Sequence, residues 1–183
     1  MKFALLTVAL SLSLSACQMV EKDPLAEYLA LAPADPSVKS NQKIQLFVNL
    51  YNKLQDKSLV DNIAKAYAEK LYFNDTVVTL HSRKELQEYL QHTQESLDSM
   101  SFEALEVYEK NNDVLVRWSM RTQFTIMGQQ RDVKSLGISH LRFNDDGKIV
   151  LHQDYWDSTQ GFYQHIPLIG GLLRWIKKGL QDY

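Results

Sequence analysis

A predicted β-hairpin at residues 134–157 constrains this chain most, because it puts titratable side chains on a face that should be buried. A run of alternating residues ends at Phe143, a turn with the sequence Asn-Asp-Asp-Gly follows at 144–147, and a second run begins at Lys148. Two alternating runs joined by a short turn that ends in Asp-Gly are typical of a hairpin. We therefore expect two antiparallel strands, with Phe143 paired to Lys148 across the turn.

The register of this hairpin decides which side chains meet. In the expected register, Ser139 faces His152 and Gly137 faces Asp154. Side chains alternate with a period of two, so one face of the hairpin would carry a mixed set of polar and large apolar groups. That set is Gly137, Ser139, Leu141, Phe143, Val150, His152, Asp154 and Trp156. Such a mixture is typical of a pocket wall, and it indicates where this protein acts without identifying its ligand.

The first 16 residues have the pattern of a secretory signal peptide. Lys2 precedes an apolar stretch at 3–14, which is too short to span a membrane permanently, and small residues lead to Cys17. The segment resembles a bacterial lipoprotein signal, which implies that Cys17 is acylated and becomes the mature N-terminus. An ordinary signal with an incidental cysteine is the alternative. By the usual sorting pattern of such lipoproteins, Gln18 favours the outer membrane, so we expect a lipid-anchored protein facing the periplasm.

Charge and cysteine content narrow the function classes. Removing residues 1–16 takes away one lysine and no acid, which leaves 19 basic and 22 acidic side chains and a net charge of −3. This balance argues against a nucleic-acid partner. Cys17 is the only cysteine, so an internal disulfide is excluded. The histidines, at 81, 92, 140, 152 and 165, show no metal-ligand spacing, and we expect neither a metal nor a cofactor.

The pattern along the chain predicts one α+β domain over residues 41–162. Residues 17–40 contain three prolines and are interpreted as a tether, with one helical turn docked on the domain. Amphipathic helices are predicted at 44–54, from Asp61 to Leu71, and after a capping box of Ser82 and Glu85, with an extended segment at 72–80. Strands are predicted at 102–109 and 114–125, with turns at 111–113 and Gly128. The helices should cover one side of a curved sheet.

Four short segments resemble the nuclear-transport-factor-2-like superfamily, which includes ketosteroid isomerases and SnoaL-like polyketide cyclases. They are residues 67–75 (YAEKLYFND), 138–143 (ISHLRF), 147–149 (GKI) and 154–156 (DYW). The resemblance covers residues 42 to about 160 and implies a cone-shaped domain, with a curved antiparallel or mixed sheet packed against three N-terminal helices. The superfamily includes enzymes, binding modules and dimerisation domains, so the fold alone does not define a function.

The resemblance also implies roles for three residues. Asp75 matches the position of the general base in ketosteroid isomerases; a solvated or turn-capping aspartate is the alternative. Tyr51 falls at, or within one residue of, the tyrosine that donates a hydrogen bond to the oxyanion. Ser139 occupies the position of the second donor, a protonated aspartate. Because losing one oxyanion donor typically costs about 10²–10³ in rate, we do not expect steroid-type isomerisation.

In place of that aspartate, the expected pocket gains His152 and Asp154. Side chains two residues apart on one strand face lie about 7 Å from each other, which allows coupling directly or through one water. An aspartate among aromatic side chains suits general acid or base catalysis, because desolvation disfavours its charge. The alternative is a structural pair that stiffens the sheet. The expected lining fits a flat apolar ligand and comprises Tyr51, Trp118, Met120, Ser139, Phe143 and Trp156.

Two surfaces outside the pocket carry further predictions. The opposite sheet face presents Leu136, Ile138, Leu151 and Tyr155, and because the superfamily commonly dimerises through that face, we expect a homodimer. Residues 163–183 predict an amphipathic helix that either closes the cone as a lid or lies on the membrane surface. We favour the lid, because an acylated Cys17 already supplies an anchor.

Three functions fit the sequence. The first is a protein tethered to the outer membrane that binds a small hydrophobic molecule in the cone with little or no catalysis. The second is a cofactor-free isomerase, cyclase or hydrolase in which Asp154 or Asp75 is the base, with His152 in support. The third is an envelope scaffold that dimerises through the outer sheet face.

Overall fold

The computed structural model of this chain describes residues 24–166 and 169–181, so the expected signal and Cys17 lie outside the described residues. Its elements are α1 (Pro24–Leu31), the 3-10 helix η1 (Pro36–Ser40), α2 (Gln45–Asn52), α3 (Leu59–Ala66), β1 (Tyr67–Asn74), β2 (Thr79–Ser82), α4 (Arg83–Ser96), β3 (Ser99–Lys110), β4 (Asp113–Ile126), β5 (Gln129–Phe143), β6 (Ile149–Trp156), α5 (Ser158–Gly161), the 3-10 helix η2 (Tyr163–His165) and α6 (Ile169–Gln181).

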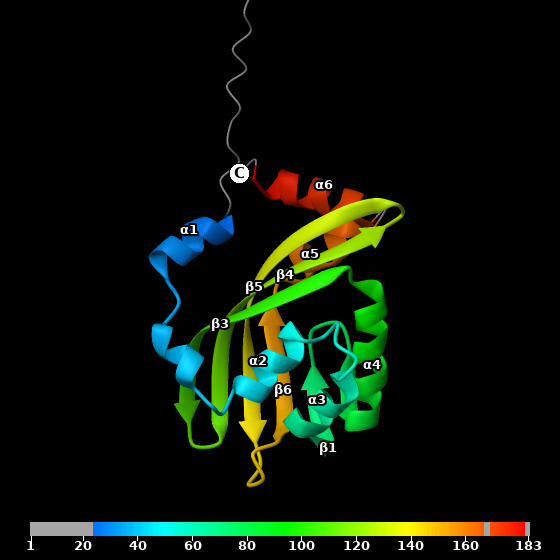
Figure 1. The fold of residues 1–183 in the computed structure, drawn as a ribbon. Helices are drawn as coiled ribbons and strands as arrows, with labels where there is room; N and C mark the ends of the chain where they lie inside the picture. The colour runs from blue at the N-terminus through cyan, green and yellow to red at the C-terminus, as the bar shows by residue number, and fades with distance from the viewer. Residues whose placement is uncertain (1–23, 167–168, 182–183) are drawn as a thin grey trace, which may run out of the picture.

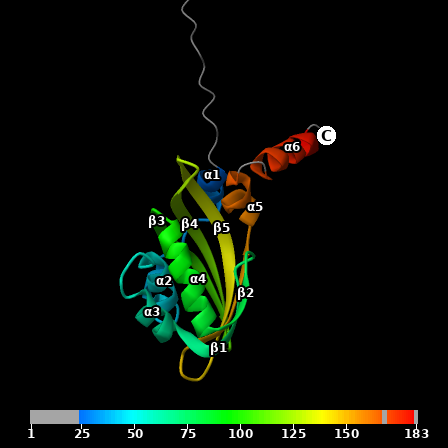
Figure 2. The same cartoon turned by 90° about the vertical axis from the view of Figure 1, so that its right-hand side faces the viewer.

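Six strands form one mixed sheet in the order β2-β1-β6-β5-β4-β3. Neighbouring strands are antiparallel except β1 and β6, which are parallel. Helices α2, α3 and α4 pack on one face of this curved sheet (Figures 1 and 2). The predicted α+β class, with three helices before the long strands, is confirmed.

The short helices form where the sequence provides apolar spacing or caps. In α2, Phe47 and Leu50 are buried. The predicted capping box starts α4: the Glu85 amide donates to Ser82 Oγ at 3.3 Å, and the Ser82 amide donates to Glu85 Oε2 at 2.9 Å. The prediction for the second helix is wrong at both ends, because α3 begins at Leu59 and ends at Ala66.

Tyr67 shows why the second helix was extended too far in the prediction. It begins β1, where Tyr67, Leu71 and Phe73 are the buried positions. A spacing of four residues, as between Tyr67 and Leu71, fits both a helical face and every second residue of a strand. The apolar pattern alone therefore did not separate the helix from the strand that continues it.

Two-residue turns join the long strands. Met127 and Gly128 connect β4 to β5 and both have positive φ, 51° and 73°. This combination matches the twist of the flanking strands. In β4, alternate residues 114, 116 and 118 are buried against the helices, as the period of two predicted.

The expected register of the last hairpin is wrong by two residues. Ser139 pairs with Asp154, not with His152, and Gly137 pairs with Trp156. One residue of the shift comes from the turn, because Phe143 pairs with Ile149 and not with Lys148. The second comes from an irregularity beside the turn, because the next pair is Arg142 with Leu151. Val150 is thus an extra residue, as in a β-bulge. Ile149 is buried in the core, in the place that was predicted for Val150. A shift of two keeps all the other side chains on their predicted faces.

The described part of the expected tether is docked on the domain. Arg117, on the outer face of β4, donates from Nη1 to the Ala32 carbonyl and from Nη2 to the Pro33 carbonyl, both at 3.0 Å. The Asp35 amide donates to the Leu105 carbonyl at 2.7 Å, and Val38 is buried. More than one helical turn therefore contacts the sheet.

Within the described ranges, no helix combines the length and apolar character that crossing a membrane requires.

Candidate functional site

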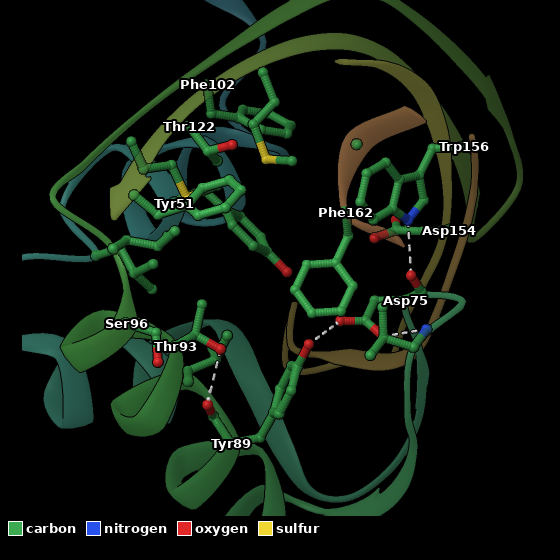
Figure 3. Close-up of a pocket in the computed structure, with 18 of the residues that line it drawn as sticks. Tyr51, Asp75, Tyr89, Thr93, Ser96, Phe102, Thr122, Asp154, Trp156 and Phe162 are labelled. Atoms are coloured by element: carbon green, nitrogen blue, oxygen red, sulfur yellow. Dashed lines mark hydrogen bonds between the residues drawn. The ribbon is translucent and has the colours of Figure 1, made fainter. Parts of the chain in front are cut away.

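A cavity of about 510 Å³ lies between the inner face of the sheet and helices α2 and α4. Five of the six predicted lining residues border it: Tyr51, Trp118, Met120, Ser139 and Trp156. Most of the lining is apolar, and the two carboxylates at its border are those of Asp75 and Asp154. Figure 3 shows the Tyr51 hydroxyl and the Phe162 ring pointing toward the middle of this space.

Phe143 is the predicted lining residue that the structure removes from the site. It is buried in the core, and the Lys43 ammonium lies 5.5 Å from the centre of its ring. The reason is its position beside the hairpin turn, at the far end of β5 from Gly137. Sharing a strand face with Ser139 therefore did not bring Phe143 to the cavity.

Asp154 has two side-chain partners in and behind the cavity wall. Its Oδ1 atom accepts from the Ser139 hydroxyl at 2.5 Å and lies 2.7 Å from His152 Nε2. The Trp118 indole N–H donates to Ser139 Oγ at 2.8 Å. Because an indole N–H can only donate, the Ser139 hydroxyl hydrogen is free to point at Asp154. The Asp154 side chain is 12% exposed.

His152 connects Asp154 to a second layer of the core. It is fully buried and does not border the cavity. Its Nδ1 atom lies 2.7 Å from the Tyr67 hydroxyl. The predicted coupling of His152 to Asp154 is thus direct.

One placement of the hydrogen atoms is consistent with both contacts of His152, to Tyr67 and to Asp154. A neutral His152 that donates from Nε2 to Asp154 must accept at Nδ1, so Tyr67 donates to it. All donors are oriented toward the Asp154 carboxylate, and such a chain of hydrogen bonds strengthens each member in a low-dielectric interior. Asp154 Oδ2 accepts no hydrogen bond from the residues that the structure describes and remains available at the cavity wall.

The tyrosines of the site stay protonated. Burial raises the pKa of Tyr51 and that of Tyr67 well above the ordinary value, because the phenolate would lose its hydration. Burial, with the nearby Asp75 carboxylate, also raises the pKa of Tyr89. At neutral pH these three residues therefore act as hydroxyl groups that donate and accept hydrogen bonds, and not as anions.

Asp75 borders the cavity, and its carboxylate holds a turn together. Oδ1 accepts from the amides of Val77 at 3.0 Å and Val78 at 2.9 Å, while Oδ2 accepts from the Tyr89 hydroxyl at 2.5 Å. Thr76, inside this turn, has a φ of 73°, which a β-branched residue rarely adopts. The three bonds match the turn-capping alternative for Asp75 and leave Asp154 as the more available carboxylate.

Two glycines make room for the tryptophans of the site. A Cβ atom on Gly137 would lie 2.3 Å from Cζ2 of Trp118, and one on Gly161 would lie 2.0 Å from Cζ3 of Trp156. Both distances are far below van der Waals contact. The indole of Trp118 therefore lies against β5 because residue 137 has no side chain, and this position brings its N–H to Ser139.

Tyr67, Tyr89 and Phe162 were not predicted as residues of the site. The first two were assigned to apolar helix faces, although a buried tyrosine usually has a partner for its hydroxyl, which was the available signal. Phe162 follows α5, borders the cavity and is 40% exposed. No pattern in the sequence identified it.

Among residues 24–166 and 169–181, no three His, Cys, Asp or Glu side chains gather as metal ligands would.

The described α6 side chains give no support to the predicted lid, which stays a prediction. None of the described α6 side chains borders the cavity, and Gly161 and Phe162 border it from the α5 side. α6 instead packs against η2. The part of the C-terminal segment that touches the cavity therefore precedes the amphipathic helix.

The six-stranded mixed sheet, the three helices on its inner face and the cavity between them define a cone-shaped domain of the nuclear-transport-factor-2-like type. Residues 47–152 match the SnoaL-like domain, and the chain belongs to this family. Comparison with curated proteins gives no match.

Solved structures from several bacteria share this fold at low sequence identity. A candidate SnoaL-like polyketide cyclase from Shewanella denitrificans OS-217 is 15% identical with a TM-score of 0.57, covering 66% of this chain and 93% of that one. A protein of unknown function from Exiguobacterium sp. 255-15 is 16% identical with a TM-score of 0.54, covering 63% and 98%. An LEH-like epoxide hydrolase from M. tuberculosis is 18% identical with a TM-score of 0.52, covering 66% and 81%.

Proposed function

We propose that this protein binds a small, mainly apolar molecule in its cone, and that the molecule donates a hydrogen bond to Asp154. The observation that carries the proposal is the cavity of about 510 Å³, which is within the range of small-molecule sites. Its apolar lining favours an apolar ligand, while Asp154 Oδ2 offers a single strong acceptor.

The network around Asp154 supports a polar contact at this point. A carboxylate that is largely removed from water costs several kcal/mol unless it is paired or hydrogen-bonded. Ser139 and His152 satisfy Oδ1, and a ligand O–H or N–H would satisfy Oδ2. The ligand class is therefore an apolar body with at least one donor group.

Binding of N-phenyl-1-naphthylamine tests this proposal, because this neutral apolar dye carries one N–H and fluoresces in apolar sites. We expect saturable binding to residues 18–183, which Thr122→Phe abolishes by filling the cavity wall. Asp154→Asn, which retains an acceptor but no charge, should weaken binding by roughly 10- to 150-fold, as expected for a lost charged hydrogen bond of about 1.5–3 kcal/mol. Asp146→Asn, in the exposed hairpin turn, is the matched control. Dye fluorescence that persists unchanged in Thr122→Phe would refute the proposal.

A second candidate function is acid/base catalysis by Asp154, as an isomerase, cyclase or hydrolase. The specific observation in its favour is the buried Tyr67–His152 pair behind Asp154, which can stabilise a changing charge on the carboxylate. A binder and an enzyme differ in their response to Asp154→Asn. For a binder the affinity falls moderately, whereas for an enzyme turnover of the bound molecule stops while its binding persists.

We further propose that the domain is held at the outer membrane through Cys17, faces the periplasm and forms a homodimer through its outer sheet face. Ile138 and Tyr155 support the dimer, because they pair across β5 and β6 and are both exposed. A scaffold that uses only this face would retain function in Asp154→Asn and lose it in Tyr155→Asp. Analytical ultracentrifugation of residues 18–183 tests the dimer, with Tyr155→Asp expected to yield monomers.

A further inference from the structure

Helix α6 presents an apolar stripe that its own domain does not cover. Leu172, Trp175 and Ile176 follow helical spacing and are 57%, 74% and 44% exposed. Gly170 is buried and Leu173 is half-buried, so the helix meets the domain along a different line of residues. An exposed stripe that includes tryptophan usually marks an interaction surface.

The charge of α6 indicates the kind of partner. Its 13 residues include Arg174, Lys177 and Lys178 and no acidic residue, whereas the whole chain has a net charge of −2. At 3.6 residues per turn, these three positions fall on the side of the helix opposite Leu172 and Ile176. A basic amphipathic helix with tryptophan on its apolar side is typical of helices that lie in a membrane interface.

The position and length of α6 fit this partner. α1 and α6 lie at the same end of the molecule in both views (Figures 1 and 2). Pro24 follows Cys17 by seven positions, a stretch that spans at most about 25 Å when extended, so an acylated Cys17 would keep this end near a bilayer. A helix of 13 residues is about 20 Å long, which is shorter than the ~30 Å hydrocarbon core.

We propose that α6 docks on an anionic bilayer surface, with its apolar stripe among the acyl chains and its basic side toward the headgroups. Along the chain, only η2 and residues 166–168 lie between Phe162 and α6. Docking of α6 therefore brings the Phe162 side of the cavity to the membrane. That consequence rests on the proposed binding function and implies exchange of an apolar ligand with the bilayer. The docking itself does not depend on it.

Tryptophan fluorescence of residues 18–183, which retain every described residue, tests the docking. Trp118 is buried and Trp156 half-buried, so Trp175 is the indole that water reaches most. We expect a blue shift and co-sedimentation with vesicles of phosphatidylcholine and phosphatidylglycerol in equal amounts, and weak binding to phosphatidylcholine alone. Trp175→Phe should retain co-sedimentation and lose most of the shift.

Charge and apolar variants separate the two contributions. Each basic residue near an anionic surface contributes about a factor of five, so Lys177→Glu with Lys178→Glu should weaken binding to the mixed vesicles by roughly 30-fold or more. Trp175→Ser with Ile176→Asp should abolish binding to both kinds of vesicle. Val60→Ser, which changes an exposed apolar residue of α3, is the matched control and should bind normally.

Three results would overturn the proposal. The first is the absence of both the shift and co-sedimentation. The second is equal binding to neutral and anionic vesicles. The third is a shift that depends on protein concentration without vesicles, which would assign the stripe to a second copy of the chain. Co-sedimentation, and the part of the blue shift that Trp175→Phe removes, do not involve the cavity, so a failure of docking and a failure of ligand binding are distinguishable.

Discussion

Ser139 and Asp154 face each other across β5 and β6, and the Ser139 hydroxyl donates to Asp154 Oδ1 at 2.5 Å. The same hydroxyl oxygen accepts from the Trp118 indole. Ser139 thus joins a tryptophan of the wall to its most available carboxylate. The site is a connected network and not a set of separate lining residues.

Ser139→Ala should therefore lower the free energy of unfolding by about 1–3 kcal/mol, because it leaves the buried Trp118 N–H without an acceptor. Urea unfolding followed by circular dichroism measures this change. Ser119→Ala, one residue from Trp118 on the outer face of β4, is the matched control and should change stability by less than about 0.5 kcal/mol. Equal effects of the two substitutions would show that the Trp118–Ser139 contact contributes nothing.

Tyr67 and His152 should act as a unit. Tyr67→Phe removes the hydroxyl that meets His152 Nδ1, and His152→Phe removes both the acceptor for Tyr67 and a donor to Asp154. We expect a coupling energy of about 0.5–3 kcal/mol in a double-mutant cycle, because groups that share one network are not additive. Additive effects within error would mean that the bond contributes no net stability.

Gly137→Ala should be strongly destabilising or should displace the Trp118 indole, because the new Cβ would lie 2.3 Å from that ring. Near-ultraviolet circular dichroism reports the position of the indole, and thermal unfolding reports stability. Gly171→Ala is the matched control, since a Cβ there meets nothing within 4 Å and alanine favours a helix. A Gly137→Ala protein with unchanged spectra would contradict the packing described for Trp118.

Alkaline pH should unfold the domain through its buried tyrosines. The pKa of Tyr51, of Tyr67 and of Tyr89 is raised on folding from 10.0 because burial disfavours the phenolate. Above pH 10 the unfolded chain releases these protons while the folded chain keeps them, so stability is complete below pH 10 and falls as pH rises. Each tyrosine contributes a slope of about 1.4 kcal/mol per pH unit.

Stability measured by urea unfolding from pH 9 to 11.5 checks this dependence. Tyr67→Phe should make the fall shallower by about one third, whereas Tyr72→Phe, at an exposed position on β1, should leave the slope almost unchanged. A stability that is constant over this range would mean that these tyrosines titrate as freely in the folded protein as in the unfolded one.

The inner face of the cone could be predicted from sequence because it depends only on the period of the strands. Ser139, Asp154 and Trp118 stayed on that face although the hairpin register was wrong by two residues. The register itself depended on the length of the turn and on the extra residue Val150 beside it, and the composition of the hairpin marks neither.

The second layer of the site could not be predicted in the same way. Tyr67 and His152 are 85 positions apart in the chain, and their contact follows from the parallel pairing of β1 with β6, which no local pattern indicates. The docking of α1 on the sheet could not be predicted from local sequence either. Arg117 holds it through backbone carbonyls, and any sequence provides these.

Native mass spectrometry of residues 18–183, isolated from a bacterial periplasm and compared with the denatured mass, tests the central claim most directly. The account predicts a discrete added mass, released on denaturation, from a mainly apolar molecule with a hydrogen-bond donor. Thr122→Phe should lose this mass while remaining folded. A homogeneous protein without added mass, which also fails to bind N-phenyl-1-naphthylamine, would contradict the claim that the cone is a ligand site.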